Sequence, residues 1–124
     1  MSLQGKRVAI MLDQQYQELE VWYPLYRLIE AGAQVSCVAS DANTAYASKL
    51  GYPCVSDLSA GDISGSDFDA VIVPGGWCPD FMRRDESMVN FIQQCVDADI
   101  VLAAICHGPW MLCSTGALQG KRAT

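Results

Sequence analysis

Residues 100–109 read Ile-Val-Leu-Ala-Ala-Ile-Cys-His-Gly-Pro, and this stretch decides the fold class more than any other. Its first six residues are apolar, which is typical of a short strand buried on both faces of a sheet. The glycine and proline that follow favour an immediate helix start, because proline suits the first helical turn. The stretch therefore predicts a buried strand, a sharp turn at Cys106, and a helix over residues 108–114 that Gly116 ends.

Similar apolar runs occur at residues 7–12, 35–39 and 69–74, and we interpret each of them as a buried strand. Residues 18–31 and 86–97 instead carry apolar side chains at helical spacing. Strands that are apolar throughout and alternate with helices are typical of a parallel sheet covered on both faces. The sequence therefore predicts a single α/β domain, a three-layer sandwich around a mostly parallel sheet.

Two further segments and one proline are open to more than one interpretation. Residues 40–56 are largely polar and contain Gly51 and Pro53, so they hold either a hairpin or an irregular excursion. Residues 57–66 indicate a short helical turn and a loop. Pro24 falls inside the first helical pattern, where we expect it to kink the helix or break it near its first turn.

Composition and charge restrict the class of protein. The chain has 124 residues, of which 51% are hydrophobic, which is enough for the core of one domain. Its formal net charge is −6 and it has no basic run, which argues against nucleic acid and anionic membranes as partners. No apolar stretch approaches the ~20 residues that span a bilayer, and the N-terminal MSLQGKR has no signal-peptide core. We therefore expect a cytoplasmic protein.

Cysteine and histidine usage argues against metal sites and disulfides. No two of the six cysteines have C-x-x-C spacing, and His107 is the only histidine. This is a poor set of ligands for a structural zinc ion. Disulfides are rare in the cytosol, so we expect none. The sequence predicts neither a metal nor a cofactor.

Cys106 is the first candidate functional residue. It ends a buried strand and precedes a helix, which is the layout of a nucleophile elbow. Backbone N–H groups at a helix start favour the thiolate, whose free pKa of ~8.5 can fall by several units there. The alternative is a buried core cysteine. Adjacency in the sequence does not by itself make His107 the general base for Cys106, because neighbouring side chains on a turn usually diverge.

Two other strand–helix junctions face the same rim, since ligands in parallel sheets bind beyond the carboxyl ends of the strands. Gly75 and Gly76 end one strand, and their N–H groups could bind an oxyanion together with that of His107. The alternative is an ordinary turn. Glu20 lies at the first junction, where a protonated carboxyl could donate a hydrogen bond to the Cys106 thiolate. The pattern alone favours the alternative, an acidic residue that stabilises a helix N-terminus.

The remaining candidates are four residues that follow the double glycine: Trp77, Cys78, Asp80 and Asp85. We interpret Asp80 and Asp85 as first-turn or capping residues. Cys78 is expected to pack beneath the loop, with a resolving thiol as the alternative. Trp77 is expected to line a pocket or to cover a subunit contact.

Four stretches, in this order, resemble the ThiJ/PfpI family of the class I glutamine amidotransferase-like superfamily, and its PfpI intracellular protease/amidase branch in particular. They are KRVAIML, YQELEVWYPLYRLIEAG, FDAVIVPGGWCPDFMRRDESMVNFI and IVLAAICHGPWMLCSTGALQGKR, which span nearly all of the chain. The resemblance implies a flavodoxin-like fold. It also implies that Cys106 is the nucleophile, that Glu20 hydrogen-bonds it, and that His107 is paired with it.

The same resemblance assigns the remaining site residues. Asp80 would complete a triad from a neighbouring subunit, so a homo-oligomer, a dimer or a hexamer, is implied. Gly75, Gly76 and the His107 N–H would form the oxyanion pocket. Apart from the resemblance, we group Trp77 with them as a candidate substrate-binding residue. Two departures stand out. Tyr16-Gln17 occupies positions where many relatives carry Phe and an acidic residue. Members also continue past Gly120-Lys121-Arg122 with further strands and a C-terminal helix, so we expect a fragment, or a chain completed by a partner.

The resulting functional expectation is a cysteine-dependent hydrolase. It would be a protease/amidase, or a glyoxalase/deglycase that acts on a small carbonyl or peptide substrate without a cofactor. One alternative is a redox-sensing or chaperone-like stress protein that uses the same cysteine without catalysis. A third interpretation is a scaffold that has lost its activity together with its C-terminal elements.

Overall fold

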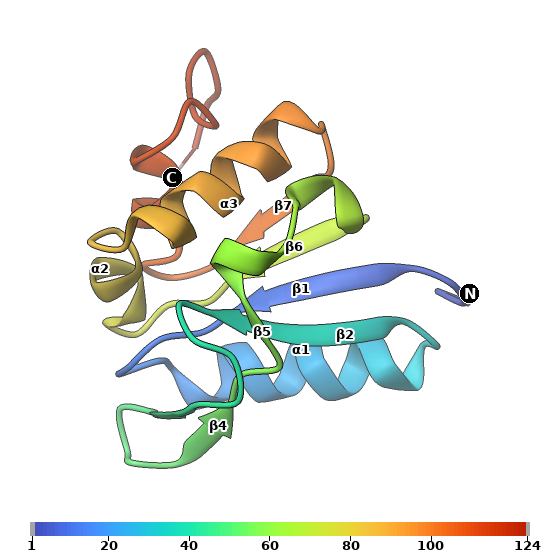
Figure 1. The fold of residues 1–124 in the computed structure, drawn as a ribbon, viewed down its shortest axis with the longest axis vertical. Coiled ribbons are helices and arrows are strands. Elements are labelled where there is room, and N and C mark those ends of the chain that lie inside the picture. The colour runs from blue at the N-terminus through green and yellow to red at the C-terminus, as the bar shows by residue number, and fades with distance from the viewer. Residues whose placement is uncertain (1, 124) are drawn as a thin grey trace.

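The computed structural model describes residues 2–123, which form an α/β sandwich around a parallel sheet (Figure 1). Within these residues, five strands pair in the order β5-β2-β1-β6-β7, and every pairing is parallel. The strands are β1 (Arg7–Met11), β2 (Gln34–Ala39), β5 (Leu58–Ser59), β6 (Ala70–Val73) and β7 (Val101–Ala104). The α/β fold with a mostly parallel sheet is thus confirmed.

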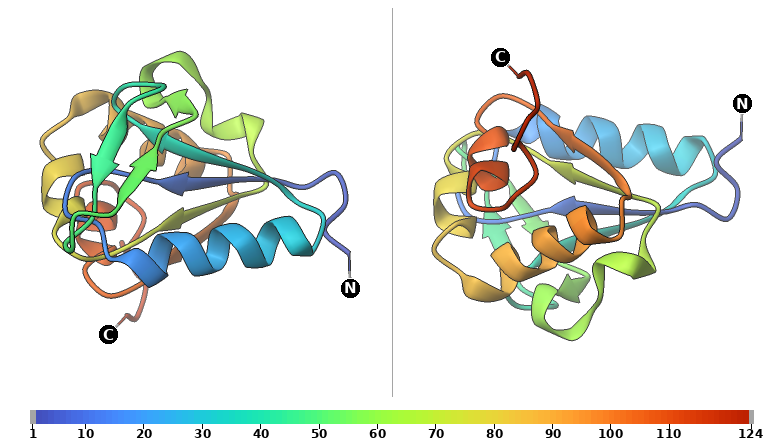
Figure 2. Two further views of the ribbon diagram at one scale, coloured as in Figure 1. Left: turned by 90° about the horizontal axis from the view of Figure 1, so that it is seen from below. Right: turned by 90° about the horizontal axis from the view of Figure 1, so that it is seen from above.

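Helices cover both faces of this sheet. Helix α1 (Glu18–Glu30) lies against one face, and α3 (Glu86–Asp97) lies against the other together with the 3-10 turns η1 (Ala60–Asp62) and η2 (Gly65–Asp67) (Figure 2). The short helices α2 (Cys78–Met82) and α4 (Pro109–Cys113) follow β6 and β7 and lie at the carboxyl ends of the strands.

Helix α1 runs without interruption through Pro24, so of the two alternatives expected there, a kink or a break, the break does not occur. Proline lacks an N–H, and the helix therefore loses the single hydrogen bond that would reach the Glu20 carbonyl. The side chain of Val21 is fully buried in the core. Packing of this apolar face accounts for the continuity of the helix, since most helical stability in proteins comes from such packing.

A hairpin outside the main sheet, β3 (Ala45–Ala47) and β4 (Pro53–Val55), confirms the hairpin alternative for residues 40–56. It contacts the loop that follows β1. The Gln15 N–H donates to the Ala47 carbonyl at 2.7 Å, and Tyr16 forms bridges both to Ser48 and to Gly76. The hairpin thus supports the loop that reaches the double glycine.

The core lies mainly between the sheet and α3. Phe91 of α3 is fully buried and packs edge-on against Phe68, with ring centroids 5.7 Å apart. The other side of β7 is open: Val101 is 65% exposed and Ile105 52%. An apolar pocket of about 460 Å³ lies between this open side and α1. It is lined by Leu19, Glu20, Tyr23, Pro24, Ile72, Ala103, Ala104 and Ile105.

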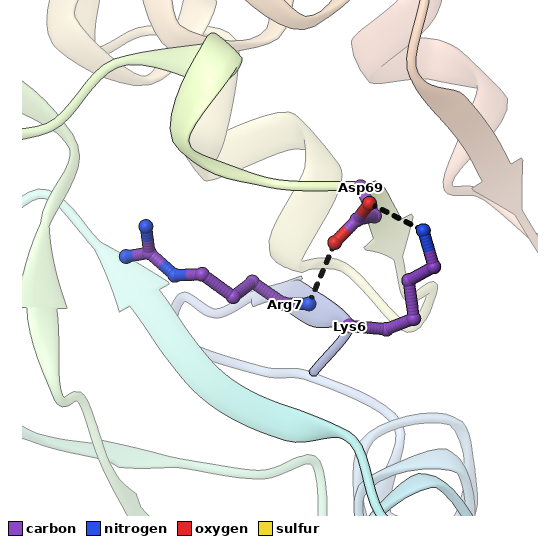
Figure 3. Close-up of polar contacts among 3 residues, drawn as sticks. All are labelled: Lys6, Arg7 and Asp69. Carbon is purple, nitrogen blue, oxygen red and sulfur yellow. Dashed lines mark hydrogen bonds and ion pairs between the residues drawn. The ribbon is translucent and has the colours of Figure 1, made fainter. Parts of the chain in front are cut away.

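Asp69 joins the starts of two neighbouring strands at the amino end of the sheet (Figure 3). Its carboxylate accepts the Arg7 N–H at 2.9 Å and pairs with the Lys6 ammonium at 3.0 Å. The Arg7 N–H and then the Lys6 side chain hold the pKa of Asp69 below its usual value. This contact lies at the amino ends of the strands, whereas the candidate site lies at their carboxyl ends.

The elements agree with the sequence expectations except in two short segments. Helix α3 covers residues 86–97 as expected. The 57–66 segment contains the 3-10 turn η1 and most of η2, which ends at Asp67. Strand β5 and helix α2 were not foreseen, because elements of two and five residues carry too little periodicity to be recognised. No helix in the described part of the chain is both long enough and apolar enough to cross a membrane.

Candidate functional site

Cys106 lies in a sharp turn between β7 and α4. Its φ is 59°, in the left-handed region, and its side chain is exposed. A non-glycine residue pays roughly 1–2 kcal/mol for this conformation. Such local strain, where it persists, is concentrated at functional positions. The turn therefore holds the thiol out at the rim instead of burying it in the sheet.

Two glycines allow the backbone to close around this turn. A Cβ added to Gly75 would lie 2.5 Å from the Cys106 Cβ, 2.9 Å from its Sγ and 2.7 Å from Glu20 Oε2. A Cβ on Gly108 would lie 2.3 Å from the Val73 carbonyl oxygen. Any side chain at these positions would collide with its neighbours. The strand ends of β6 and β7 are thus drawn together, and the thiol and the Glu20 carboxylate converge on one point beside Gly75.

Glu20 faces the site instead of capping its own helix. Gln17 is the N-cap of α1, and its side chain accepts the Glu20 N–H at 3.0 Å. The Glu20 carboxylate is then free to accept the Gly75 N–H at 2.6 Å, a contact between residues 55 apart in the chain. A short hydrogen bond to a carboxylate oxygen is among the stronger kinds in proteins. It fixes the end of β6 against the start of α1.

The backbone amides at the rim divide into occupied and available groups. The Gly75 N–H is occupied by Glu20. Within residues 2–123, the Gly76 and His107 N–H groups have no acceptor. Gly76 has a φ of 75°, and a Cβ there would lie 2.4 Å from the Gln15 carbonyl oxygen. Of the three residues expected to donate to an oxyanion, Gly76 and His107 are therefore the ones with a free amide.

His107 lies beside the thiol and contacts two indole rings. Its Nδ1 is 3.7 Å from Cys106 Sγ, so the two neighbouring side chains do not diverge. Trp77 stacks on the imidazole with centroids 5.4 Å apart and an interplanar angle of 16°. Trp110 approaches the imidazole at 4.6 Å and 51°. The sequence reasoning missed Trp110, although its position three residues after His107 at the start of a helix was a usable signal.

Asp80 does not contact His107 within this chain. It lies in the first turn of α2, which agrees with its interpretation as a first-turn residue even though the helix itself was not predicted. Its carboxylate pairs with the Arg84 guanidinium. Asp85 is the N-cap of α3 and accepts the Met88 N–H at 3.1 Å, so its capping role is confirmed.

Cys78 is buried beneath the double-glycine loop, with its thiol 3.1 Å from the Gly75 carbonyl oxygen. Burial, and then the nearby Asp13 and Glu20 carboxylates, raise the pKa of this thiol. It is the packed thiol that we expected. Asp13, at the end of β1, was not foreseen, and burial raises the pKa of its carboxyl above the ordinary value.

The remaining reactive side chains are mainly the cysteine thiols. All six cysteines are free in this structure, and Cys106 and Cys113 are the two exposed ones. Among residues 2–123, no group of three or more His, Cys, Asp or Glu side chains is arranged to hold a metal ion.

The fold and the site together define a class, the doubly wound α/β proteins with an exposed cysteine at the turn between a strand of the parallel sheet and the helix that follows it. The chain belongs to the DJ-1/PfpI family, whose family model matches residues 6–124.

Curated relatives are similar over nearly the whole of this chain. It is 34% identical over 120 residues to the "Putative cysteine protease YraA" of Bacillus subtilis, covering 97% of this chain and 71% of the relative. It is 36% identical over 118 residues to "Deglycase PYRAB04690" of Pyrococcus abyssi, covering 95% and 70%.

Solved structures show the same fold in longer chains. A two-domain protein from Anabaena variabilis, with DJ-1/ThiJ/PfpI-like and ferritin-like domains, superposes with a TM-score of 0.90 at 36% identity, covering 94% of this chain and 34% of that one. Oxidized Toxoplasma gondii DJ-1 superposes with a TM-score of 0.87 at 21% identity, covering 97% and 66%. The chain thus spans less than two thirds of these solved chains.

Proposed function

We propose that this chain carries the catalytic site of a cysteine-dependent hydrolase that acts on small carbonyl or amide compounds. The observation that carries the proposal is the exposed Cys106 thiol beside Glu20 and two unoccupied backbone amides. Deglycase and cysteine protease relatives at 34–36% identity support the same class of chemistry.

In the proposed step, His107 Nδ1 takes the proton from the Cys106 thiol, and the sulfur attacks the substrate carbonyl carbon. A C–S bond forms, and the π electrons of the C=O bond move to its oxygen. The Gly76 and His107 N–H groups then donate to that oxygen. The adduct then collapses: the C=O bond re-forms, the bond from carbon to the leaving group breaks, and His107 gives its proton to that group. Water next adds to the carbonyl carbon of the thioester through His107, the C–S bond breaks, the product leaves as the carboxylic acid, and the thiol regains its proton.

Glu20 supports this step from the opposite side. By accepting the Gly75 N–H, it holds the end of β6 against the turn at Cys106. A carboxyl group that converges with the thiol on one point can share a proton with it, as the resemblance implies. Glu20→Gln keeps an acceptor for Gly75 and removes the charge, so it separates the two roles.

The test compares the two exposed cysteines. Cys106→Ala is expected to abolish consumption of methylglyoxal or cleavage of an aminoacyl reporter, while Cys113→Ala, the matched control, keeps it. The same rates in both variants would refute the proposal. So would a Cys106 thiol that reacts with iodoacetamide no faster than a free thiol of pKa ~8.5.

A redox-sensing function is the second candidate, because the same exposure favours oxidation of Cys106 by peroxide. Oxidation to the sulfenic acid transfers one oxygen from hydrogen peroxide to the sulfur and releases water. Stoichiometric oxidation at Cys106 in a protein that turns over no dicarbonyl, peptide or aminoacyl reporter would favour the sensor over the enzyme.

We further propose that the chain works as a homo-oligomer in which Asp80 of one copy approaches His107 of another. Asp80 is partly exposed and pairs with Arg84 in its own chain, so it would have to exchange that partner. Mixing Asp80→Asn with Cys106→Ala tests this arrangement. Activity that returns on mixing supports the shared site, and two inactive variants that remain inactive together refute it.

A further inference from the structure

The imidazole of His107 is held by aromatic rings. Trp77 stacks on it nearly in parallel, and Trp110 covers it at a tilt. Both indoles are partly exposed, Trp77 at 50% and Trp110 at 38%, so neither is placed there simply to fill the core.

Hydrogen bonding does not fix this ring. Within residues 2–123, the one polar contact of the His107 side chain is the 3.7 Å approach of Nδ1 to Cys106 Sγ. Asp80, the carboxylate that the resemblance assigns to it, pairs with Arg84 in the same chain. A catalytic histidine is usually oriented by a hydrogen bond from its second nitrogen to a third group. Within this chain, the groups in contact with the ring besides the thiol are the two indoles.

The two indoles are held by the backbone on either side of the site. The backbone N–H of Trp77 donates to the Gln15 carbonyl at 2.9 Å, and the backbone N–H of Trp110 donates to the His107 carbonyl at 3.0 Å. Helices α2 and α4 pack together, and Arg83 Nε donates to Ser114 Oγ at 2.8 Å across them. The separation of the indoles is therefore set by how these two short helices dock.

We propose that Trp77 and Trp110 are positioning residues that hold the His107 imidazole against the Cys106 thiol. Their faces carry the negative end of the aromatic quadrupole, so they also favour the imidazolium that forms when His107 takes the thiol proton. This inference rests on the proposed function of Cys106 and His107. It adds a means of orienting the base within a single chain.

The experiment uses the full chain and replaces each indole twice. Trp77→Leu and Trp110→Leu remove the aromatic face, whereas Trp77→Phe and Trp110→Phe keep a smaller one. Phe81→Leu is the matched control, because Phe81 is an exposed aromatic residue of α2 that stacks on Arg84 instead of His107. The readouts are kcat and KM for the carbonyl substrate and the NMR signals of the imidazole. The chain has one histidine, so these signals are unambiguous.

Misplacing a reacting group by about 1 Å can cost about 100-fold in rate. We therefore expect each Leu variant to lose about 10- to 100-fold in kcat with KM nearly unchanged, each Phe variant to recover most of it, and Phe81→Leu to match the wild type. The imidazole ring protons should move downfield in the Leu variants as the indole ring current is lost.

Three results would overturn the proposal. A rise in KM at constant kcat would show that the indoles line a substrate pocket and do not position the imidazole. Equal losses of kcat in Phe81→Leu and in the two Trp→Leu variants would show that the effect comes from general packing of α2. Imidazole signals that do not move in either Leu variant would show that the rings are not in contact in solution. If Cys106→Ala keeps full turnover, the proposed function fails, and the NMR comparison still decides whether the indoles hold the ring.

Discussion

Gly75→Ala adds a single methyl group at the point where the thiol, the Glu20 carboxylate and the end of β6 converge. The new Cβ would lie 2.5 Å from the Cys106 Cβ and 2.7 Å from Glu20 Oε2. Ordinary carbon contacts begin near 3.4 Å, so the neighbours must separate by about 1 Å. Overpacking of this size costs about 1–3 kcal/mol of unfolding free energy. A shift of about 1 Å in the position of the thiol also predicts a loss of up to about 100-fold in the rate at which it reacts.

Two assays measure these effects separately. Urea denaturation gives the unfolding free energy, and iodoacetamide labelling gives the reactivity of Cys106 relative to Cys113. Chymotrypsin cleavage after Trp110 separates the two cysteines for mass spectrometry. Gly116→Ala is the control, because a Cβ there meets nothing within 4 Å. If Gly75→Ala matches Gly116→Ala in both stability and labelling ratio, the convergence at Gly75 is refuted.

Three further predictions concern stability. Asp85→Ala removes the N-cap of α3 and should lower the unfolding free energy by about 1 kcal/mol in urea denaturation. Burial raises the pKa of Cys95 to about 12, so the wild type should lose stability as the pH rises above about 9, by at most about 1.4 kcal/mol per pH unit more than Cys95→Ala. Asp69 has a lowered pKa, so the stability it contributes relative to Asp69→Asn should be complete above about pH 5 and lost as the pH falls toward 2.

Each of these predictions has a result that would contradict it. An Asp85→Ala protein as stable as the wild type would mean that the cap bond to Met88 contributes nothing. Parallel pH profiles of the wild type and Cys95→Ala between pH 9 and 11 would show that this thiol ionises as readily in the folded as in the unfolded chain. A difference between the wild type and Asp69→Asn that persists at pH 2 would exclude the carboxylate as its source.

The sequence was sufficient for the layers of the fold because its strongest signals are long. The apolar run before Cys106 and the helical spacing of residues 86–97 each imply a buried element, and their alternation implies a parallel sheet. At Pro24 the sequence left a kink or a break open. The helix is not broken, because packing of α1 against the sheet offsets one lost hydrogen bond, which a rule for isolated helices does not include.

Which residues share the rim was predictable in part, whereas their contacts were not. Strand ends place Glu20, Gly75 and Cys106 on one rim, and this follows from topology alone. Which acceptor takes the Gly75 N–H depends on distances of a few tenths of an ångström, which no pattern of residue types encodes. The tilted contact of Trp110 with His107 likewise depends on a side-chain rotamer in a helix of five residues.

The order of strands in the sheet has a consequence for how the thiol can be used experimentally. Glu20, Gly75 and Cys106 follow three strands that are adjacent in space, β1, β6 and β7, yet they span most of the chain. No short peptide cut from this protein could reproduce their neighbourhood. An unusually fast reaction at Cys106 would therefore report that β1, β6 and β7 have assembled, so a simple alkylating dye could follow refolding in real time.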